Sequence, residues 1–430
     1  MLFDDFSLTP YLKKMIAFSS GGYFLDGYLM TIIGLALASI TKELRMDAYW
    51  MGALGAAALI GMFFGGILGG YITDKYGRQK MFVYNLIAII ILSLFQAFAV
   101  TPTQLFIGRL LIGIVIGADY PIATSLVIEF SPRKIRSTTI GVVTSVWMLG
   151  AVAADCMGYL LGDNWRMMLG SGAIFAAILY LGRRGSPESP RWLMNKGHIN
   201  EARAVVKQLY GADVEFNMQE KVVPTRYGKI FSRQYLKRTL FIAITWGVQS
   251  IPFYCFFTFA PIVLAALGIS GSGEEAIKVD IVISTMFFLS TVFAIWLCKL
   301  IGRRPLMIFS FVVSTAALFA LGILPNSGGP IIIMIMFLAY AITNGLSGIL
   351  QVLYPNELFP TEIRASAVGF GTGASRLGAA VGNYLMPAYM MSHPVGTLMM
   401  LGAGVSLVGL LISIAWAPET KGMTLSESGR

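Results

Sequence analysis

The feature that most constrains this chain is a series of twelve apolar segments, each long enough to cross a lipid bilayer as a helix. They lie near residues 15–40, 49–73, 81–100, 103–129, 138–161, 166–183, 239–265, 279–298, 305–324, 329–356, 365–391 and 394–416. Only 13% of the 430 residues are charged, about half the fraction usual in soluble domains. Because backbone polar groups must be satisfied internally in lipid, the sequence predicts an all-α, multi-pass membrane protein with twelve transmembrane helices.

The net charge of +10 is unevenly distributed along this pattern. If the N-terminus is cytoplasmic, the segments on the cytoplasmic side hold 26 of the 32 Lys and Arg residues, and the outer loops hold four. An excess of basic residues in cytoplasmic loops is the usual sign of membrane topology. We therefore expect both termini to be cytoplasmic, and we interpret the charge as topology rather than as a surface for nucleic acid.

Three short motifs occur twice, in the same order, at offsets of 225 to 231 residues. The motif that begins EFSPRKIR at Glu129 returns as ELFPTEIR at Glu357. The Gly-Arg turn at Gly77 returns at Gly302, and the Pro-Glu of SPESPRWL returns in APETKG. Such a repeat indicates a duplicated six-span unit. We expect domains at 1–183 and 238–430, joined by a cytoplasmic linker at 184–237.

These motifs resemble those of the major facilitator superfamily, in the branch that holds sugar porters, phosphate:proton symporters and organic-ion transporters. The segments that show this resemblance are GGYITDKYGRQK, RLLIGIVIGADYP, PESPRWL, ELFPTEIRASAVG and PETKG. The chain also resembles a group of enterobacterial inner-membrane metabolite transport proteins. The resemblance implies two pseudo-symmetric six-helix bundles, alternating access, a monomer and a bacterial inner-membrane location.

Four charged residues lie deep inside the first, fourth and fifth spans, where a charge is costly and persists mainly at a partner or a cavity. They are Asp26, Arg109, Asp119 and Asp155. Arg109 and Asp155 are expected at similar depth, so they could form a structural ion pair. The resemblance to phosphate symporters instead implies that Asp26, Arg109 and Asp119 couple transport to protons. Relatives often read Asp-Gly-Tyr-Asp in the first span, whereas here the last position is Leu29.

Polar and aromatic residues at mid-depth are the candidates for substrate contact. They are Tyr28, Tyr120, Trp147, Trp246, Gln249, Tyr254, Asn344, Gln351 and Arg376. Pro252, in the seventh span, could break the helix and expose backbone groups to a cavity. Most single aromatic residues in a span pack against lipid or other helices, so the set is a hypothesis about the site as a whole.

Arg376 is the most informative of these residues, because it lies about 11 residues from the cytoplasmic end of its span. A guanidinium facing a cavity binds carboxylate or phosphate through paired hydrogen bonds. Organic-anion transporters in the family carry an arginine at the matching place. The alternative is that Arg376 pairs with Asp26 or Asp119 across the two bundles and has a structural role.

Residues at the cytoplasmic ends of the spans resemble the family's gating network, which latches the cytoplasmic side. By this likeness Glu129 pairs with Arg78, and the second half repeats the arrangement. The expected set is Asp74, Arg78, Glu129, Arg136, Arg303, Glu357 and Arg364.

The linker shows helical spacing at 198–210, with Asn200 as a candidate cap. The sequence has no glycine-rich phosphate loop followed by Lys-Ser/Thr, no nucleophile–base pair and no metal-ligand cluster. We therefore expect neither a cofactor nor a metal, and not an enzyme.

The leading hypothesis is a proton-coupled symporter of a small organic anion, such as a carboxylate or sugar acid. A neutral sugar or polyol symporter is the alternative, favoured by PESPRWL and by the tryptophan in the seventh span. A non-transporting receptor on a carrier scaffold is a third hypothesis, from a different class.

Overall fold

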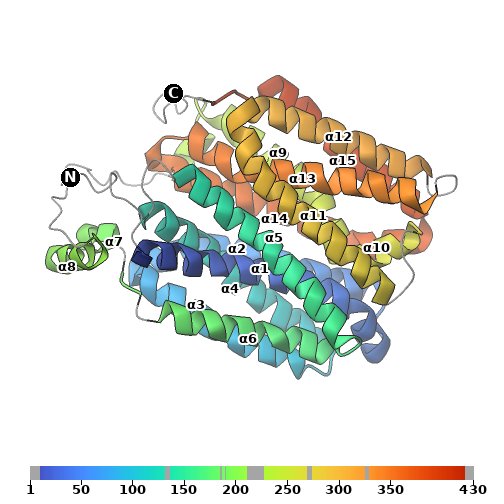
Figure 1. The fold of residues 1–430 in the computed structure, drawn as a ribbon, viewed down its shortest axis with the longest axis horizontal. Coiled ribbons are helices and arrows are strands. Elements are labelled where there is room, and N and C mark those ends of the chain that lie inside the picture. The colour runs from blue at the N-terminus through green and yellow to red at the C-terminus, as the bar shows by residue number, and fades with distance from the viewer. Residues whose placement is uncertain are drawn as a thin grey trace.

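The computed structural model describes residues 10–130, 136–184, 186–188, 190–210, 227–268, 274–324 and 329–421. Long helices fill both halves of the chain (Figure 1). The first half contains α1 (Pro10–Leu44), α2 (Ala48–Tyr76), α3 (Arg78–Ala97), α4 (Pro102–Phe130), α5 (Arg136–Leu161) and α6 (Trp165–Arg183). The second half contains α9 (Leu236–Thr258), α10 (Ala260–Ala266), α11 (Glu274–Ile301), α12 (Arg303–Ile323), α13 (Pro330–Leu358), α14 (Thr361–Ser392) and α15 (Val395–Trp416).

Eleven of these helices are long and apolar enough to cross a membrane. The remaining long helix, α14, has 32 residues but contains many glycines and the polar residues Arg376 and Asn383, which lower its hydropathy. It packs along α2 and α9, so its polar residues are covered by protein. Together with α14, the helices match the twelve expected spans to within a few residues at most ends.

The helices pair in the same way in both halves, which confirms the duplication. In the first bundle α1 packs along α5, α2 along α4 and α3 along α6. In the second bundle the corresponding pairs are α9 with α14, α11 with α13 and α12 with α15. The bundles meet along two further pairs, α2 with α14 and α5 with α11, which are also related by the repeat. The structure is therefore a pair of pseudo-symmetric six-helix bundles.

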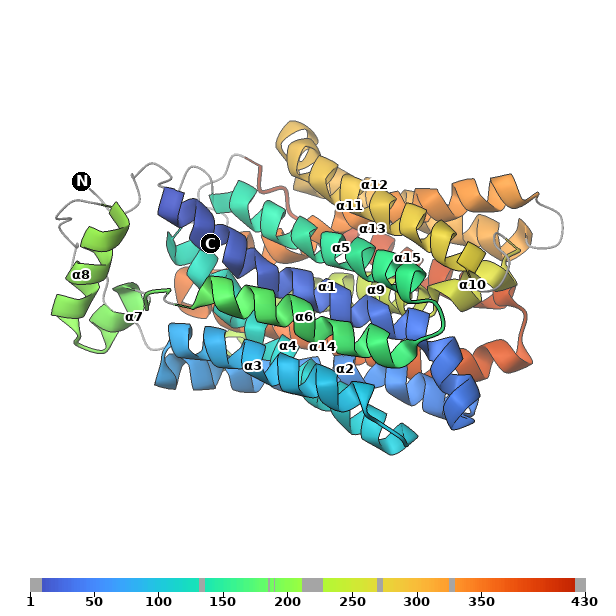
Figure 2. The same cartoon turned by 60° about the horizontal axis from the view of Figure 1, so that its bottom comes forward.

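The small helices α7 (Pro190–Asn195) and α8 (Ile199–Tyr210) lie beside one end of the bundles, at the left of Figures 1 and 2. We call this the linker end and the opposite one, near α10, the far end. The predicted linker helix is present as α8, but Asn200 lies inside the helix and is not its cap. A 3-10 turn, η1 (Tyr227–Phe231), precedes α9.

Glycines let α2 and α4 approach closely, as their number in the second span predicts. A Cβ on Gly61 would lie 2.2 Å from the carbonyl oxygen of Leu110, and one on Gly65 would lie 2.0 Å from that of Ile114. Neither distance is possible for a real side chain, so any larger residue would force the two helices apart.

The seventh span does not break where the sequence suggested. The helix α9 continues through Pro252 and ends at Thr258, and α10 begins at Ala260 with Pro261 in its first turn. Proline lacks an N–H and clashes with the preceding turn, so Pro261 separates the two helices. At the break, Asn383 donates to Thr258 Oγ1 over 2.9 Å and to the carbonyl oxygen of Gly55 over 3.2 Å. The break is therefore held by one amide that joins α2, α9 and α14.

The repeated Gly-Arg turns are each capped by a glutamate from the repeated Pro-Glu motif. Gly77 and Gly302 have φ of 103° and 95°, which favours glycine. Glu188 accepts from the backbone N–H of Gln79, and Glu419 accepts from those of Arg303 and Arg304, all at 3.1 Å. Each carboxylate thus satisfies the first N–H groups of α3 or α12 and opposes the positive end of the helix dipole.

Replacing Glu419 with alanine is expected to lower the free energy of unfolding by about 1–2 kcal/mol, the usual cost of losing a helix cap. Partial burial raises the pKa of Glu419, but hydrogen bonds from the N–H groups of Arg303, Lys421 and Arg304 outweigh it and lower the pKa. Because folding lowers the pKa of Glu419, its carboxylate stabilises the folded protein fully at pH values above its pKa in the unfolded chain. This stabilisation is lost as the pH falls through the pKa of Glu419 in the folded protein.

Thermal unfolding in detergent at pH 7 and at pH 4 checks this expectation. The difference between the wild type and the alanine variant should shrink at pH 4. Glu275→Ala, at an exposed position of α11, is the control. An equal difference at both pH values would contradict the capping role.

Candidate functional site

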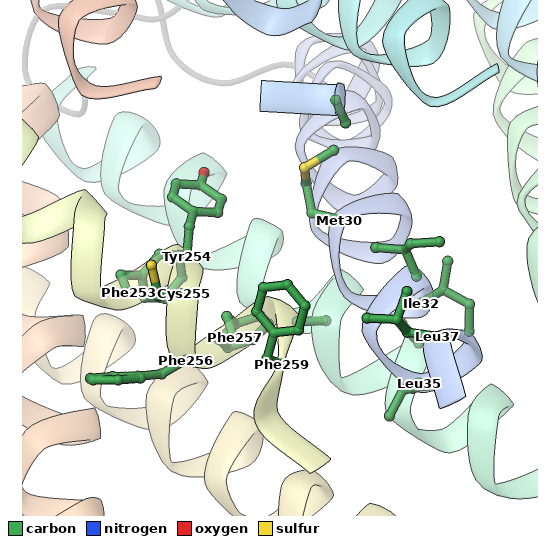
Figure 3. Close-up of a cluster of buried hydrophobic side chains, with 14 of the residues drawn as sticks. Met30, Ile32, Leu35, Leu37, Phe253, Tyr254, Cys255, Phe256, Phe257 and Phe259 are labelled. Atoms are coloured by element: carbon green, nitrogen blue, oxygen red, sulfur yellow. The ribbon is translucent and has the colours of Figure 1, made fainter. Parts of the chain in front are cut away.

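The centre of the molecule, between the two bundles, is occupied by Asp26 of α1 and Trp147 of α5. Asp26 is 2% exposed, and the indole N–H of Trp147 donates to its Oδ2 over 2.5 Å. The ring of Trp147 also contacts the second bundle, with ring centroids 5.7 Å from Phe253 and from Phe257 and 6.3 Å from Tyr254. Figure 3 shows this aromatic face of α9 opposite the apolar residues of α1. Trp147 therefore links a buried carboxylate of one bundle to the aromatic wall of the other.

Arg376 of α14 lies on the second-bundle side of the same region. Its guanidinium carbon is 4.8 Å from the ring centroid of Tyr254, and the residue is 4% exposed. Tyr23 and Tyr254 both lie within electrostatic range of Asp26 and of Arg376. The structure thus gathers a carboxylate, a guanidinium and two phenols from α1, α9 and α14, and the indole of Trp147 from α5, because these four helices meet at the interface of the bundles.

A small pocket in the first bundle connects Asp26 with Asp119 of α4. It is lined by Gly22, Tyr23, Asp26, Ile116 and Asp119. The two aspartates therefore lie at similar depth, as expected from their distance to the ends of their helices.

Asp119 is held by two residues that the sequence did not suggest. Asn85 of α3 donates to its Oδ1 over 3.2 Å, and Arg183 of α6 lies 3.4 Å from the same oxygen. Arg183 is fully buried, lies 3.5 Å from the ring centroid of Phe82 and donates to the carbonyl oxygens of Phe18 and Phe82. Asp119 is thus part of an ion pair inside its own bundle.

The ion pair that the sequence allows between Arg109 and Asp155 is not formed. Arg109 donates to the carbonyl oxygen of Leu29 over 2.8 Å and lies within electrostatic range of Asp26. Neither carboxylate oxygen of Asp155 has a hydrogen bond of full geometry among the described residues, and the charge that acts on it is that of Asp280 in α11. The two residues lie at comparable depth, but their side chains leave α4 and α5 in different directions. Depth alone could not distinguish these cases.

Amide groups of the second bundle form a polar row beside the aromatic wall. Gln249 of α9 donates to Asn344 Oδ1 of α13 over 2.7 Å, and Asn344 donates to the hydroxyl of Tyr340 over 3.3 Å. The side-chain amide of Gln351 donates to the carbonyl oxygen of Thr245 over 3.5 Å. Thr245 lies one turn nearer the linker end of α9 than Gln249. Trp246 is buried on the same helix, against α14 at Gly371. Of these predicted residues, Gln249 and Asn344 are in direct contact, and Trp246 and Gln351 lie on the same two helices.

One other predicted substrate residue, Tyr28, does not join this site, and a second, Tyr120, falls outside the described side chains. The hydroxyl of Tyr28 is 2.5 Å from Ser171 Oγ, and its ring lies 4.6 Å from that of Phe175, so Tyr28 packs inside the first bundle. Tyr120 is in α4, but its side chain lies outside the described part of the structure.

The predicted gating network is described only in the second half. Arg303 and Glu357 form an ion pair of 2.9 Å, and Glu357 also accepts from the hydroxyl of Thr420. This contact is confirmed. The side chains of Asp74, Arg78, Glu129, Arg136 and Arg364 lie outside the described part of the structure.

Three buried polar residues near these groups were missed, namely Asn85, Arg183 and Asp280. Arg183 and Asp280 lie close to the ends of their apolar runs, where charged residues usually contact water, so hydropathy placed them at the boundary. In the structure α6 ends at Arg183 and α11 begins six residues before Asp280, and both side chains are buried. Among the described residues, no group of three His, Cys, Asp or Glu side chains is arranged to hold a metal ion.

Comparisons with known proteins agree with this architecture. The family described as "Sugar (and other) transporter" matches residues 14–430. The chain is 44% identical to YaaU of Escherichia coli K12 over 429 residues, which cover 99% of this chain and 96% of YaaU. It is 33% identical to the inner membrane metabolite transport protein YgcS of the same strain over 431 residues, with the same coverage of each chain.

A solved structure has the same fold. The xylose transporter XylE from E. coli, in an inward open conformation, aligns with a TM-score of 0.80 at 21% identity, over 97% of this chain and 99% of XylE. The family match, the two relatives and the repeated six-helix bundles lead to one conclusion: the chain is a multi-pass membrane protein that belongs to the "Sugar (and other) transporter" family and has the major facilitator fold.

Proposed function

We propose that this protein is a secondary active transporter that carries a small organic anion, a carboxylate or sugar acid, together with protons by alternating access. The observation that carries the proposal is the position of Arg376, which is 4% exposed in the middle of α14 and faces Tyr254 at the interface of the bundles. Substrate sites in such carriers form at the interface of the repeats. A guanidinium there offers paired donors of the geometry that a carboxylate accepts.

Proton coupling is supported by the surroundings of Asp26. This carboxylate is buried between the bundles, bonded to Trp147 and within electrostatic range of Arg109 and of the two tyrosines. A desolvated carboxylate that changes its partners between access states can take up a proton in one state and release it in the other. XylE, which shares the fold, is described as a proton:xylose symporter.

The competing charges at the site also suggest how substrate and proton are linked. Asp26 and Arg376 act on the same two tyrosines, so each charge partly neutralises the electrostatic effect of the other. Protonation of Asp26 would remove the negative charge that offsets Arg376. The electrostatic potential at the site would then be more positive and would favour binding of an anionic substrate. Proton and anion would then bind best together, which is the requirement for symport.

A neutral sugar or polyol is the second candidate substrate, favoured by the row formed by Gln249, Asn344 and Tyr340. Amide groups both donate and accept hydrogen bonds and are therefore suited to hydroxyl groups. In this version Arg376 has a structural role near Asp26.

Binding and uptake in proteoliposomes test the anion proposal. The protein would be offered labelled monocarboxylates, dicarboxylates, sugar acids, neutral hexoses and phosphate, with and without an inward proton gradient. We expect one class of acid to bind, and Arg376→Ala to weaken its binding by about 100-fold or more, because truncating a buried charge partner costs 2–5 kcal/mol. Arg376→Lys should restore only part of the affinity, since lysine cannot form the paired bonds.

Gln249→Ala is the matched control, because it removes a buried polar group of the same site without changing charge. It should weaken acid binding much less than Arg376→Ala. Transport of neutral hexoses alone, with binding that survives Arg376→Ala but not Gln249→Ala, would contradict the anion proposal and favour the sugar symporter.

We also propose that the linker end is cytoplasmic, with the division at 1–183, 184–237 and 238–430 and with the protein acting as a monomer. The basic residues concentrated in the linker and in the neighbouring loops support this orientation.

A further inference from the structure

Two buried aspartates face each other across the interface of the bundles, away from the site described above. Asp155 of α5 is fully buried and Asp280 of α11 is 4% exposed. The charge of Asp280 acts on Asp155 across the interface, and among the described residues no other charged group does so. A like-charged pair in a buried interface between two helices is unfavourable unless something neutralises it.

The register of α5 and α11 places these residues opposite each other. The two helices run antiparallel and are in contact at both ends of the interface. Near the far end Lys278 lies 5.4 Å from the ring of Tyr159, and near the linker end a Cβ on Gly141 would be 2.8 Å from Ile295. Between these two contacts, residue 155 must lie level with a residue near 281 or 282. The geometry of the helices therefore brings the two carboxylates together independently of their charges.

A third buried polar group lies beside the two carboxylates. Ser284 lies one helical turn after Asp280, is fully buried and acts on Asp155 as a weak donor, although the contact falls short of full hydrogen-bond geometry. Both carboxylate oxygens of Asp155 and the hydroxyl of Ser284 have no hydrogen-bond partner among the described residues. Buried polar atoms are nearly always bonded, so three such atoms in one place need an explanation.

Among the described residues of the surrounding helices, no cation acts on either aspartate. At this level α1 presents Ile32 and Leu35, and the described titratable groups of α13 are Tyr340, Tyr354 and Glu357, all nearer the linker end. Arg109 of α4 interacts electrostatically with Asp26, and the thiol of Cys156 on α5 is exposed. On α11, Lys278 and Glu275 are exposed near its far end, and α10 contains no titratable residue.

We propose that Asp155 and Asp280 together bind one proton, which joins the two bundles near their far end. One carboxyl group then donates a hydrogen bond to the other, as in paired aspartates that share a proton, and Ser284 completes the site. The shared proton removes the repulsion and supplies the donor that Asp155 lacks. The site is distinct from Asp26, because it lies about eight residues nearer the far end than Trp147 on α5.

This site would make closure of the far end depend on pH, an inference that rests on the proposed alternating access. Opening the far end separates α5 from α11 and exposes both carboxylates to water, where each ionises independently. The closed form therefore holds one proton more than the open form. Closure is favoured at low pH and weakened as pH rises.

Spin-label distance measurements in lipid nanodiscs, without substrate, test the inference. Labels would be placed on Leu160→Cys of α5 and Ile331→Cys of α13, both highly exposed near the far end, in a protein with Cys156→Ser. We expect the ratio of closed to open protein to fall as pH rises from 5.5 to 8.5, by up to about tenfold per pH unit for a single proton.

Asp280→Asn and Asp155→Asn, each made separately, should keep the far end closed at all pH values. The asparagine amide donates permanently to the remaining carboxylate and so replaces the proton. The control is Glu275→Gln, which neutralises an exposed acid on α11 and should leave the pH dependence unchanged. Melting temperature in detergent confirms that each variant is folded.

Three results would overturn the inference in different ways. The pair binds no proton if both closed and open label distances are seen but their ratio does not depend on pH. The same holds if both Asn variants show the pH dependence of the wild type. If sodium ions at constant pH close the far end and Asp280→Asn abolishes that effect, the pair is a sodium site. If the labels never separate at any pH, alternating access itself fails, and with it this role of the pair.

Discussion

Asp26→Asn is expected to abolish accumulation of the transported anion while leaving its exchange across the membrane intact. For an electroneutral carrier of one proton and one monovalent anion, an inward gradient of two pH units supports about 100-fold accumulation, because each unit is worth 1.36 kcal/mol. The asparagine variant cannot carry the proton, so its accumulation ratio should fall to about one. Asparagine can still accept the bond from Trp147, so the packing between the bundles is retained.

Uptake and counterflow in the same proteoliposomes measure this effect. Counterflow needs only substrate binding and alternating access, and it should survive in the variant. Asp163→Asn, at an exposed position between α5 and α6, is the matched control and should accumulate substrate as the wild type does. If Asp26→Asn still accumulates the anion under the gradient, the proton is carried elsewhere. If it loses both counterflow and binding, Asp26 contacts the substrate directly.

Arg183→Met is expected to cause the largest loss of stability, about 3–5 kcal/mol, because it leaves Asp119 as a buried charge without its ion-pair partner. Arg183 is fully buried and also bonds the carbonyl oxygens of Phe18 and Phe82, so it connects α1, α3, α4 and α6. The melting temperature in detergent should fall accordingly. Arg184→Met, at the exposed next residue, changes the same charge and should have little effect.

A double variant distinguishes the charge from the packing of this side chain. In Arg183→Met with Asp119→Asn, no charge remains buried, and asparagine can still accept from Asn85. We expect most of the stability to return. Similar stability of the single and double variants would show that packing of Arg183 on Phe82, and not its charge, holds the bundle together.

Much of the architecture could be predicted from local patterns, because a bilayer imposes a strict relation between sequence and structure. An apolar run must form a helix in lipid, and a repeated motif must form a repeated turn. The Gly-Arg turns at Gly77 and Gly302 were found in this way, and so was the ion pair of Arg303 with Glu357. The glutamate caps of these turns were not foreseen, since Glu188 and Glu419 are more than 100 residues away from them.

The candidate site was predicted in its parts but not in its contacts. Polar groups at mid-depth in a span cost free energy to bury, and aromatic groups there are easy to recognise. On these grounds the sequence indicates Asp26, Trp147, Tyr254 and Arg376 as candidates. Which of them meet depends on the rotation of each helix about its axis, and that rotation is set by packing against its neighbours. For this reason Tyr28, a candidate for the site from its depth, packs on Ser171 instead, and Asp155, which by depth could pair with Arg109, faces Asp280.

The sequence by itself determined the membrane class, the duplicated helices and the depth of each charged residue, because these follow from hydropathy and from a rise of 1.5 Å per residue. Only the tertiary structure decided the partners of those charges. Asp119 could pair with Arg183 because α4 and α6 both contact α3 in the first bundle, and Asp155 could face Asp280 because α5 and α11 meet between the bundles. Depth is a property of one helix, whereas a contact is a property of two.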